Sequence, residues 1–191
     1  LSGLTNEQKT KENQAVNGAQ TRDQVANKLR DAEALDQSMQ TLRDLVNNQN
    51  AIHSTSNYFN EDSTQKNTYD NAIDNGSTYI TGQHNPELNK STIDQTISRI
   101  NTAKNDLHGV QKLEQAQQQS INTINQMTGL NQAQKEQLNQ EIQQTQTRSE
   151  VHQVIKKAQA LNDSMNTLRQ SITDENEVKQ TSNYINETVG N

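Results

Sequence analysis

Apolar side chains recur every three or four residues along residues 25–46 and again along residues 151–172. The first segment carries Val25, Leu29, Ala32, Leu35, Met39, Leu42 and Val46, and the second carries Val151, Ile155, Ala158, Leu161, Met165, Leu168 and Ile172. A stripe with this spacing predicts a long helix packed in a left-handed bundle. Neither segment contains proline or glycine, so we expect two uninterrupted helices with Leu35 and Leu161 in a core.

A helix start precedes each stripe. Thr21 and Thr147 open a Thr-x-x-Gln and a Thr-x-x-Glu pattern, which caps the N-terminus of a helix. A shorter helix is predicted ahead of each long one. The first starts at Thr5, where Gln8 completes a capping box. Its counterpart spans residues 131–145, with an apolar face formed by Ala133, Leu138 and Ile142.

The apolar pattern predicts further helices between the two stripes. We expect the first long helix to continue to about residue 55 and residues 57–63 to form a turn, with the next helix starting at Ser63 or Thr64. The apolar face of that helix consists of Tyr69, Ala72, Ile73, Gly76, Tyr79 and Ile80. Glycine weakens a helix by roughly 1 kcal/mol relative to alanine, so Gly76 indicates a close helix crossing.

A break follows between Gly82 and Pro86, the only proline. A cap within residues 91–94 then predicts a helix whose apolar face consists of Ile93, Ile97, Ile100, Ala103 and Leu107. The same register continues through Val110, Leu113, Ala116, Ser120, Ile124 and Met127. Gly109 lies inside this pattern and could end a helix. The unbroken register favours one continuous or slightly bent helix instead.

The chain repeats itself at an offset of 126 residues. Residues 1–65 and 127–191 share 25 identities without a gap, and both stripes contain the phrase Ala-Leu-x-x-Ser-Met-x-Thr-Leu-Arg. Such a period is typical of a repeat array, and we expect this chain to be a window from a longer array that holds about one and a half units.

Together these elements predict an all-α fold of tandem three-helix bundles joined by long shared helices and arranged as an elongated rod. On this prediction, residues 1–48 are the last two helices of one module and residues 49–109 form a complete three-helix module. Residues 110–172 form a complete module of the first kind, and residues 173–191 start another module of the second kind.

Composition narrows the class of protein. Only 28% of the residues are apolar, five are aromatic and 53 are Asn or Gln, so each core is thin and the surface is polar. The net charge is −6 and no Lys/Arg run exceeds two residues, which argues against nucleic-acid binding. Cysteine is absent, so thiol chemistry is excluded. No apolar run is long enough to span a membrane, and we expect a monomer in solution.

No catalytic or metal-binding constellation is evident. The four histidines stand in different segments, at His53, His84, His108 and His152. None has a His or acidic partner at zinc-binding spacing. We interpret acid pairs such as Glu61-Asp62 and Asp174-Glu175 as solvated charge, because a thin bundle offers no pocket that would shift their pKa values. We therefore expect no enzyme activity, no catalytic or metal-binding residues and no cofactor.

The clearest motif is Thr-Ser-Asn-Tyr-x-Asn-Glu, which occurs at residues 55–61 and again at residues 181–187. One interpretation is a turn whose Tyr58 or Tyr184 plugs the end of a bundle. The other is a recurring ligand contact. The sequence leaves the ligand-binding residues unassigned.

Several phrases agree in order and spacing with a known family. They are the 126-residue period, the Gly-Leu-(Thr/Asn)-x-x-Gln-Lys opening, the Gln-Thr-Arg-x-x-Val helix start, the Ala-Leu-x-x-Ser-Met core and the Thr-Ser-Asn-Tyr turn. In these features the chain resembles the giant staphylococcal extracellular-matrix-binding proteins, whose arrays alternate FIVAR and GA modules. On this resemblance, residues 1–48 and 110–172 correspond to GA modules, and residues 49–109 and 173–191 to FIVAR modules.

The resemblance implies a secreted protein of the bacterial cell surface, associated with the cell wall, that attaches bacteria to host matrix, notably fibronectin, and supports biofilm accumulation. GA modules of other surface proteins bind serum albumin through an apolar and aromatic patch around their second helix. The corresponding residues 131–145 contain no aromatic residue and are rich in Gln, so we do not carry albumin binding over. The alternative function is a purely structural stalk of the cell envelope without a specific ligand.

Overall fold

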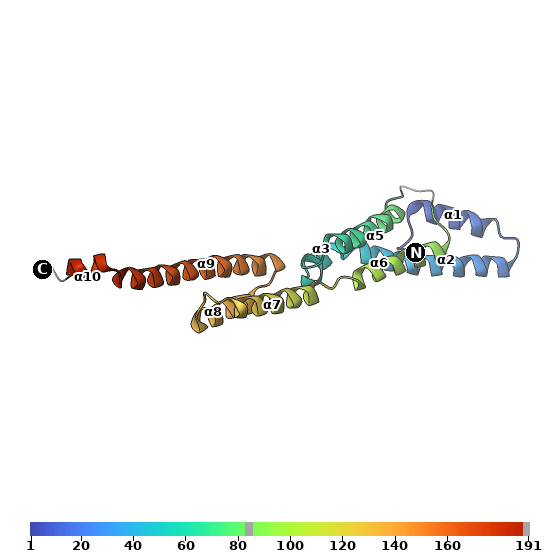
Figure 1. The fold of residues 1–191 in the computed structure, drawn as a ribbon. Coiled ribbons are helices and arrows are strands. Elements are labelled where there is room, and N and C mark those ends of the chain that lie inside the picture. Colours follow the sequence, from blue (N-terminus) through green and yellow to red (C-terminus); the bar gives the residue numbers. More distant parts are fainter. Residues whose placement is uncertain (83–85, 189–191) are drawn as a thin grey trace. The chain divides into compact units, whose positions relative to one another are not determined.

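A computed structural model describes residues 1–82 and 86–188 (Figure 1). Over these residues the chain is helical and has no strand, which confirms the all-α prediction. The helices are α1 (Asn6–Asn17), α2 (Arg22–Asn47), α3 (Gln49–His53), α4 (Ser56–Phe59), α5 (Ser63–Thr81), α6 (Lys90–Asn105), α7 (Gly109–Gln126), α8 (Gln132–Gln144), α9 (Arg148–Lys179) and α10 (Ser182–Thr188). The chain divides into two compact units, Leu1–Val110 and Gln111–Asn191. Most of the break predicted between Gly82 and Pro86 lies outside the described residues.

The C-terminal half of α2 packs with α5 and α6 to form the core of the first unit (Figure 1). The buried apolar side chains of this core are Leu4, Leu35, Met39, Leu42, Tyr69, Ile73, Ile93, Ile100, Ala103 and Leu107. Leu35, Met39 and Leu42 are almost completely buried. The stripe predicted for α2 is therefore confirmed as a core over this half of the helix.

Helix α5 crosses its neighbours at Gly76. Tyr69, Ile73 and Gly76 are buried on the predicted face of α5. A Cβ atom on Gly76 would lie 3.0 Å from methyl carbons of both Ile100 and Leu42, so a larger side chain would push these residues apart. The close crossing predicted from this glycine is confirmed.

A Gly-Leu turn is tied to the long helix in both copies of the repeat. The Gly3 N–H donates to Asp36 Oδ1 at 2.7 Å, and the Gly129 N–H donates to Asn162 Oδ1 at 2.8 Å. A Cβ atom on either glycine would overlap with the backbone oxygen of the same Asp36 or Asn162. Asp and Asn both supply the acceptor oxygen, so the contact survives the exchange between copies.

In the second unit, α7, α8 and α9 enclose a separate core. Its buried side chains are Ile124, Met127, Leu130, Leu138, Ile142, Val151 and Ala158. Capping boxes start α8 at Asn131 and α9 at Thr147, because each side chain accepts from the third helical N–H and the residue at that position bonds back. The helix starts predicted at Thr5, Thr21 and Thr147 are confirmed, because each threonine side chain accepts from the backbone N–H three residues later.

The two copies of the long helix bury opposite halves of the same stripe. In α2, Leu42 is 0% exposed, whereas Val25 and Leu29 are 39% and 49% exposed. In α9, Val151 is 3% exposed, whereas Leu168 is 52% exposed. The N-terminal half of the stripe therefore packs in a bundle of the α7 and α8 kind, and the C-terminal half packs in a bundle of the α5 and α6 kind. One long helix serves two modules.

The predicted continuous helix through Gly109 is wrong. Helix α6 ends at Asn105 and α7 begins at Gly109. Leu107 is buried in the first core, and the His108 N–H donates to the carboxylate of Glu61. These contacts hold the chain in a non-helical bend between the two helices, although the apolar period continues across it.

Four smaller predictions also change. The first long helix ends at Asn47 rather than near residue 55, and Ile52, in α3 beyond this break, packs against the first core. Helix α4 occupies part of the predicted turn, whereas α5 starts at Ser63 as predicted. Helix α6 begins at Lys90, because the side chain of Asn89 caps it. Leu161 is half-buried rather than fully buried.

The unequal burial of the stripe can be measured at equivalent positions. Leu42→Ala should lower the free energy of unfolding by about 2–5 kcal/mol, because the side chain is fully buried. Leu168→Ala, the same position in the second copy, should lower it by less than about 1 kcal/mol. Urea denaturation followed by circular dichroism measures both losses. Equal losses would contradict the divided stripe.

Candidate functional site

The repeated Thr-Ser-Asn-Tyr turn is the candidate site that the sequence singled out. Thr55 caps the short helix α4, and its Oγ1 accepts from the Tyr58 N–H at 3.3 Å. The Thr55 hydroxyl also donates to the Ile52 carbonyl oxygen at 2.7 Å. The hydroxyl of one residue thus joins the end of α3 to the start of α4, and this placement brings His53 beside Tyr58.

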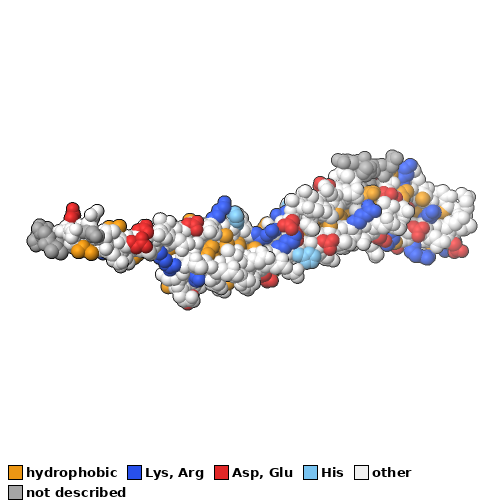
Figure 2. All heavy atoms as spheres, in the orientation of Figure 1, with side chains coloured by type: hydrophobic (Ala, Val, Ile, Leu, Met, Phe, Trp, Pro, Cys, Tyr) orange, Lys and Arg blue, Asp and Glu red, His pale blue; other side chains and the backbone are white. Residues whose placement is uncertain are grey.

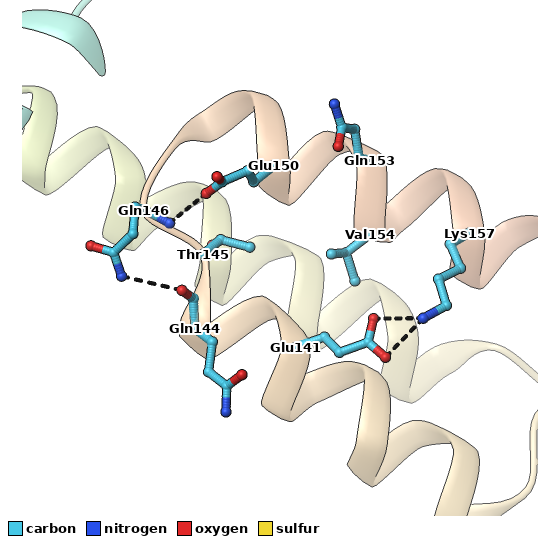
Figure 3. Close-up of a pocket in the computed structure, with 8 residues that line it drawn as sticks. All are labelled: Glu141, Gln144, Thr145, Gln146, Glu150, Gln153, Val154 and Lys157. Carbon is cyan, nitrogen blue, oxygen red and sulfur yellow. Dashed lines mark hydrogen bonds and ion pairs between the residues drawn. The ribbon is translucent and has the colours of Figure 1, made fainter.

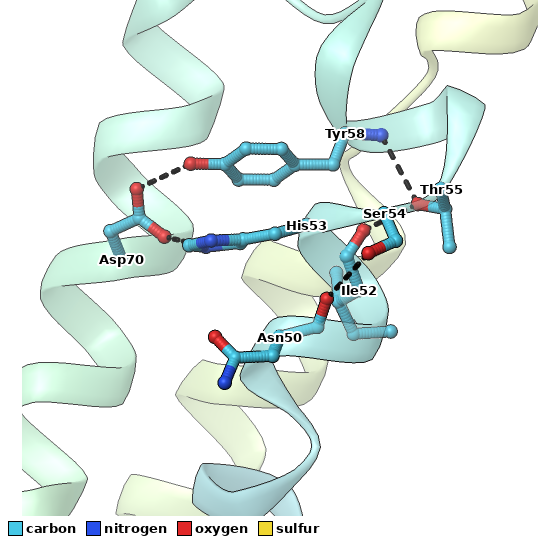
Figure 4. Close-up of polar contacts among 7 residues, drawn as sticks. All are labelled: Asn50, Ile52, His53, Ser54, Thr55, Tyr58 and Asp70. Carbon is cyan, nitrogen blue, oxygen red and sulfur yellow. Dashed lines mark hydrogen bonds and ion pairs between the residues drawn. The ribbon is translucent and has the colours of Figure 1, made fainter.

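His53 and Tyr58 both bind the carboxylate of Asp70 on α5 (Figure 4). The distance from His53 Nε2 to Asp70 Oδ1 is 2.7 Å, and the Tyr58 hydroxyl donates to Asp70 Oδ2 at 2.6 Å. The two rings stack with centroids 4.1 Å apart, and each meets the buried Tyr69 edge-on at 6.2 Å. The Lys66 ammonium lies 5.6 Å from the centre of the Tyr58 ring. Both the hydroxyl group and the ring of Tyr58 therefore contact other residues of the first unit.

The environment of this cluster shifts the pKa values of Asp70 and of the two tyrosines, Tyr58 and Tyr69. Burial raises the pKa of Asp70, but the hydrogen bonds from Tyr58 and His53 stabilise the carboxylate and more than offset it, so the net pKa lies below its ordinary value. Burial, together with the hydrogen bond to this carboxylate, raises the pKa of Tyr58 to about 12. Tyr58 thus remains a neutral donor and Asp70 a charged acceptor. This arrangement favours the interpretation of Tyr58 as a plug of the bundle.

The second half of the motif holds the bend between α6 and α7. The Asn57 side-chain oxygen accepts from the Val110 N–H at 3.2 Å, and Glu61 accepts from the His108 N–H. A Cβ atom on Gly109 would overlap with the backbone oxygens of Ser56 and Asn57. The turn and the bend therefore pack backbone against backbone, and only glycine fits at position 109.

The interpretation of Glu61 as solvated charge is wrong. Glu61 is 4% exposed, and its carboxylate accepts from the N–H groups of both Asp62 and His108. Asp174 and Glu175 are exposed, as predicted, and Glu175 pairs with Lys179. A buried carboxylate persists where backbone donors satisfy it.

The second copy of the motif forms the same local turn. The Thr181 hydroxyl donates to the Val178 carbonyl oxygen at 2.7 Å and accepts from the Tyr184 N–H. Tyr184 is 42% exposed. Lys179 takes the place of His53, so the stacked pair is not repeated. The turn is therefore encoded locally, while the cluster around Tyr58 depends on α5.

Sequence reasoning missed three side chains of this site. Asn57 and Glu61 recur in the second copy as Asn183 and Glu187, and this recurrence of polar residues was a usable signal for a structural role. Asp70 lies outside the duplicated stretch, so the sequence held no comparable signal for it.

The three histidines that the structure describes do not assemble a metal site. His53 binds Asp70, and His108 Nδ1 lies 2.8 Å from the Asp106 carbonyl oxygen. His152 is exposed on α9, and His84 lies outside the described residues. Among the residues that the structure describes, no group of three or more His, Asp or Glu side chains could hold a metal ion.

A shallow groove of about 430 Å³ lies between α8 and α9 (Figure 3). It is lined by Glu141, Gln144, Thr145, Gln146, Glu150, Gln153, Val154 and Lys157. Lys157 bridges both carboxylate oxygens of Glu141, at 2.8 and 2.7 Å. Backbone hydrogen bonds from Gln146 and Thr147 lower the pKa of Glu150. The charged groups of the groove are thus engaged internally, and the lining offers no nucleophile with an adjacent base.

Uncharged polar groups dominate the visible surface. In Figure 2, acidic and basic side chains are scattered among white atoms rather than gathered into one field. No helix among the described residues is both long and apolar enough to cross a membrane.

Two family models together match almost the whole chain. The GA module matches residues 1–38 and 110–164, and the FIVAR domain matches residues 38–108 and 164–189. The two boundaries from a GA match to a FIVAR match, at residues 38 and 164, are 126 positions apart and fall inside α2 and α9. The boundaries predicted at residues 48 and 172 remain a proposal about where to divide a helix that two modules share.

Similar proteins and structures come from staphylococci. The extracellular matrix-binding protein ebh of Staphylococcus aureus strain MRSA252 is 38% identical over 98% of this chain, and that of strain MW2 is 40% identical over 96%. The chain spans 2% of the length of each. A crystal structure of a domain of EbhA from Staphylococcus aureus superposes with a TM-score of 0.71 at 29% identity, covering 81% of this chain and 64% of that one. A structure from work on Embp-mediated adherence of Staphylococcus epidermidis to fibronectin gives a TM-score of 0.54 at 35% identity, covering 56% and 84%.

The cluster around Asp70 predicts a dependence of stability on pH. The folded-state pKa of Asp70 is below its ordinary value of 3.8, so the stabilisation is present above that value and is lost as the pH falls through the folded-state pKa. We expect Asp70→Asn to destabilise the chain at neutral pH and the difference from the unsubstituted chain to shrink in acid. Urea midpoints measured between neutral pH and about pH 3 test this. Asp74→Asn, an exposed position on the same helix, is the control, and a pH-independent difference at Asp70 would contradict the assignment.

The bend predicts a strict requirement for glycine. Gly109→Ala should lower the free energy of unfolding by about 1–3 kcal/mol, because the added methyl group overlaps with two backbone oxygens. Gly18→Ala is the matched control, since its Cβ atom would meet nothing nearer than 3.4 Å. Thermal melting of both variants compares the two sites. Equal melting temperatures would rule out the close packing at Gly109.

Proposed function

The chain belongs to the family of staphylococcal extracellular matrix-binding proteins built from GA modules and FIVAR domains, and on that premise we propose that it is a segment of a cell-surface adhesin. In this proposal the segment takes part in binding of the host extracellular matrix. The observation that carries it is the 38–40% identity, over nearly the whole chain, to proteins named for that binding.

Fibronectin is the matrix component we propose as the partner. The structural neighbour at 35% identity comes from work on Embp-mediated adherence to fibronectin. By the same analogy, the adhesin is secreted, is associated with the bacterial cell wall and supports biofilm accumulation. Albumin is not proposed, because α8 carries no aromatic residue.

The contact surface fits the FIVAR-like part better than the groove between α8 and α9. Glu141, Val154 and Lys157 of that groove correspond to Ala15, Lys28 and Asp31 in the first copy. A contact used in every repeat of an array needs chemistry that recurs, and the groove does not supply it. We propose instead that the matrix contact lies on the module formed by α5, α6 and the C-terminal half of α2, the part that the FIVAR domain matches.

Weak single contacts suffice for such a protein. Linking modules turns later binding events into intramolecular ones, and avidity can exceed single-site affinity by about 10² to 10⁴. The Asn- and Gln-rich composition is consistent with modest affinity for each unit.

A structural stalk without a specific ligand is the second candidate. Helix α9 has 32 residues, roughly 48 Å at 1.5 Å per residue, and it is shared between modules. Such helices favour a rod in which the modules line up. An enzyme is excluded as a candidate, since the chain belongs to families of non-enzymatic repeat modules.

The test of matrix binding uses the repeat itself. Because residue 127 is equivalent to residue 1, copies of residues 1–126 can be joined in register and followed by residues 127–191. We expect such an array to bind immobilised fibronectin at physiological salt about 10² to 10⁴ times more tightly than the single chain. Immobilised albumin is the control surface.

Two outcomes separate the candidates. If neither the chain nor the array binds fibronectin, the adhesin proposal is wrong for this segment. Small-angle scattering of the same array then tests the stalk, because an elongated particle supports it and a compact particle rejects it.

A further inference from the structure

Two Asn-Gly steps occur in this chain, at Asn17-Gly18 and Asn75-Gly76. Asn17 is the last residue of α1 and Gly18 is its C-cap, and both residues are exposed. Asn75 lies inside α5, where Gly76 is buried in the helix crossing. The two steps share the same local chemistry and differ only in their place in the fold.

We propose that Asn17 is a site of spontaneous deamidation, at which water converts the side-chain amide into a carboxylate. The deprotonated backbone nitrogen of Gly18 attacks Cγ of Asn17. The bond from Gly18 N to Cγ forms, the bond from Cγ to Nδ2 breaks, and ammonia leaves. Water then opens the five-membered imide at one of its two carbonyl carbons, which yields aspartate or isoaspartate. The reaction needs no oxidant, reductant or enzyme.

The setting of Gly18 favours this attack. Its N–H donates to the Gln14 carbonyl oxygen at 3.0 Å, and this bond closes the last turn of α1. Release of a terminal turn requires almost no free energy, because helix ends fray locally. Glycine has no Cβ atom to shield its nitrogen, and the nearest neighbour of a Cβ built there would be the Gln14 carbonyl oxygen, at 3.4 Å.

The setting of Gly76 opposes the same attack. Its position is packed between Ile100 and Leu42, each 3.0 Å from where a Cβ would stand. Asn75 can leave the helical conformation only if the middle of α5 opens. Opening of a core helix approaches the free energy of global unfolding, so the chemistry at this step is strongly slowed.

The second copy of the repeat provides an internal comparison. Gln143 and Gln144 occupy the positions equivalent to Asn17 and Gly18, at the end of α8. A glutamine would need a six-membered ring, and the following nitrogen is shielded by a side chain. Only one of the two equivalent helix ends is therefore open to this modification.

The modification changes the turn between α1 and α2. A carboxylate at the C-terminus of a helix interacts unfavourably with the helix dipole, and isoaspartate also lengthens the backbone. We expect the modified chain to have a looser end of α1. This inference concerns the GA-like hairpin and is independent of the proposed matrix binding.

Mass spectrometry of the intact folded chain after ageing in mildly alkaline buffer tests the proposal. Trypsin places the three sites in separate peptides, residues 12–22, 67–90 and 136–148. We expect the mass change from amide to carboxylate at Asn17 to appear at least about tenfold faster than at Asn75, with no such change at Gln143. Under denaturing conditions the two Asn-Gly steps should react at similar rates.

Two variants complete the test. Asn17→Gln should abolish the change in the peptide of residues 12–22 while leaving the melting curve unaltered, since glutamine occupies the equivalent position in the second copy. Asn17→Asp should mimic the product and increase amide hydrogen exchange at the end of α1. Retention of the amide at Asn17 in the folded chain, or equal rates at Asn17 and Asn75, would overturn the proposal.

Discussion

The apolar stripe of the long helices is the constraint on which the rest of the structure depends. The two halves of this stripe pack against two different sets of neighbouring helices. Val151 and Ala158 are buried in the core with α7 and α8, whereas Leu35, Met39 and Leu42 are buried in the core with α5 and α6. In this chain each copy buries mainly the half of the stripe whose bundle is present, and the other half is exposed at Val25, Leu29 and Leu168. The boundary between modules therefore falls inside a helix, although each bundle has its own core.

The two kinds of module boundary are built differently. From the GA-like to the FIVAR-like part, the helix runs on, and the family boundary falls inside α2 or α9. In the other direction, the chain bends at residues 106–108 before α7 begins. Polar groups hold that bend, with the Glu61 carboxylate and the Asn57 amide as acceptors for backbone N–H groups. At the first boundary, one helix with a continuous apolar stripe runs through both modules. At the second, hydrogen bonds and the close packing of Gly109 hold the segment between two helices.

Most of the helices could be predicted because their signals are local. The stripe of α2 and the capping boxes of α8 and α9 depend on residues only a few positions apart, and the structure has them as expected. The bend before Gly109 could not be predicted, because the side chain that stabilises it, Glu61, lies 47 residues earlier. The same limit applies to Asp70, whose role depends on α5 packing beside the turn of Tyr58. Periodicity identifies which face is buried, but it does not reveal a polar contact made across the fold.

Comparison of the two copies separates structural from functional constraint. Gly3, Leu35, Asn57 and Glu61 are all identical in the second copy, and each makes an internal contact that explains why substitution is unfavourable. At these four positions repetition is accounted for by folding, and it does not by itself mark a surface for a ligand. For the adhesin proposed above, we place the matrix contact either on α5 and α6 of the FIVAR-like part, beyond the duplicated stretch, or in general features of an amide-rich surface. The second possibility requires many copies to achieve attachment, which is consistent with relatives of which this chain spans 2%.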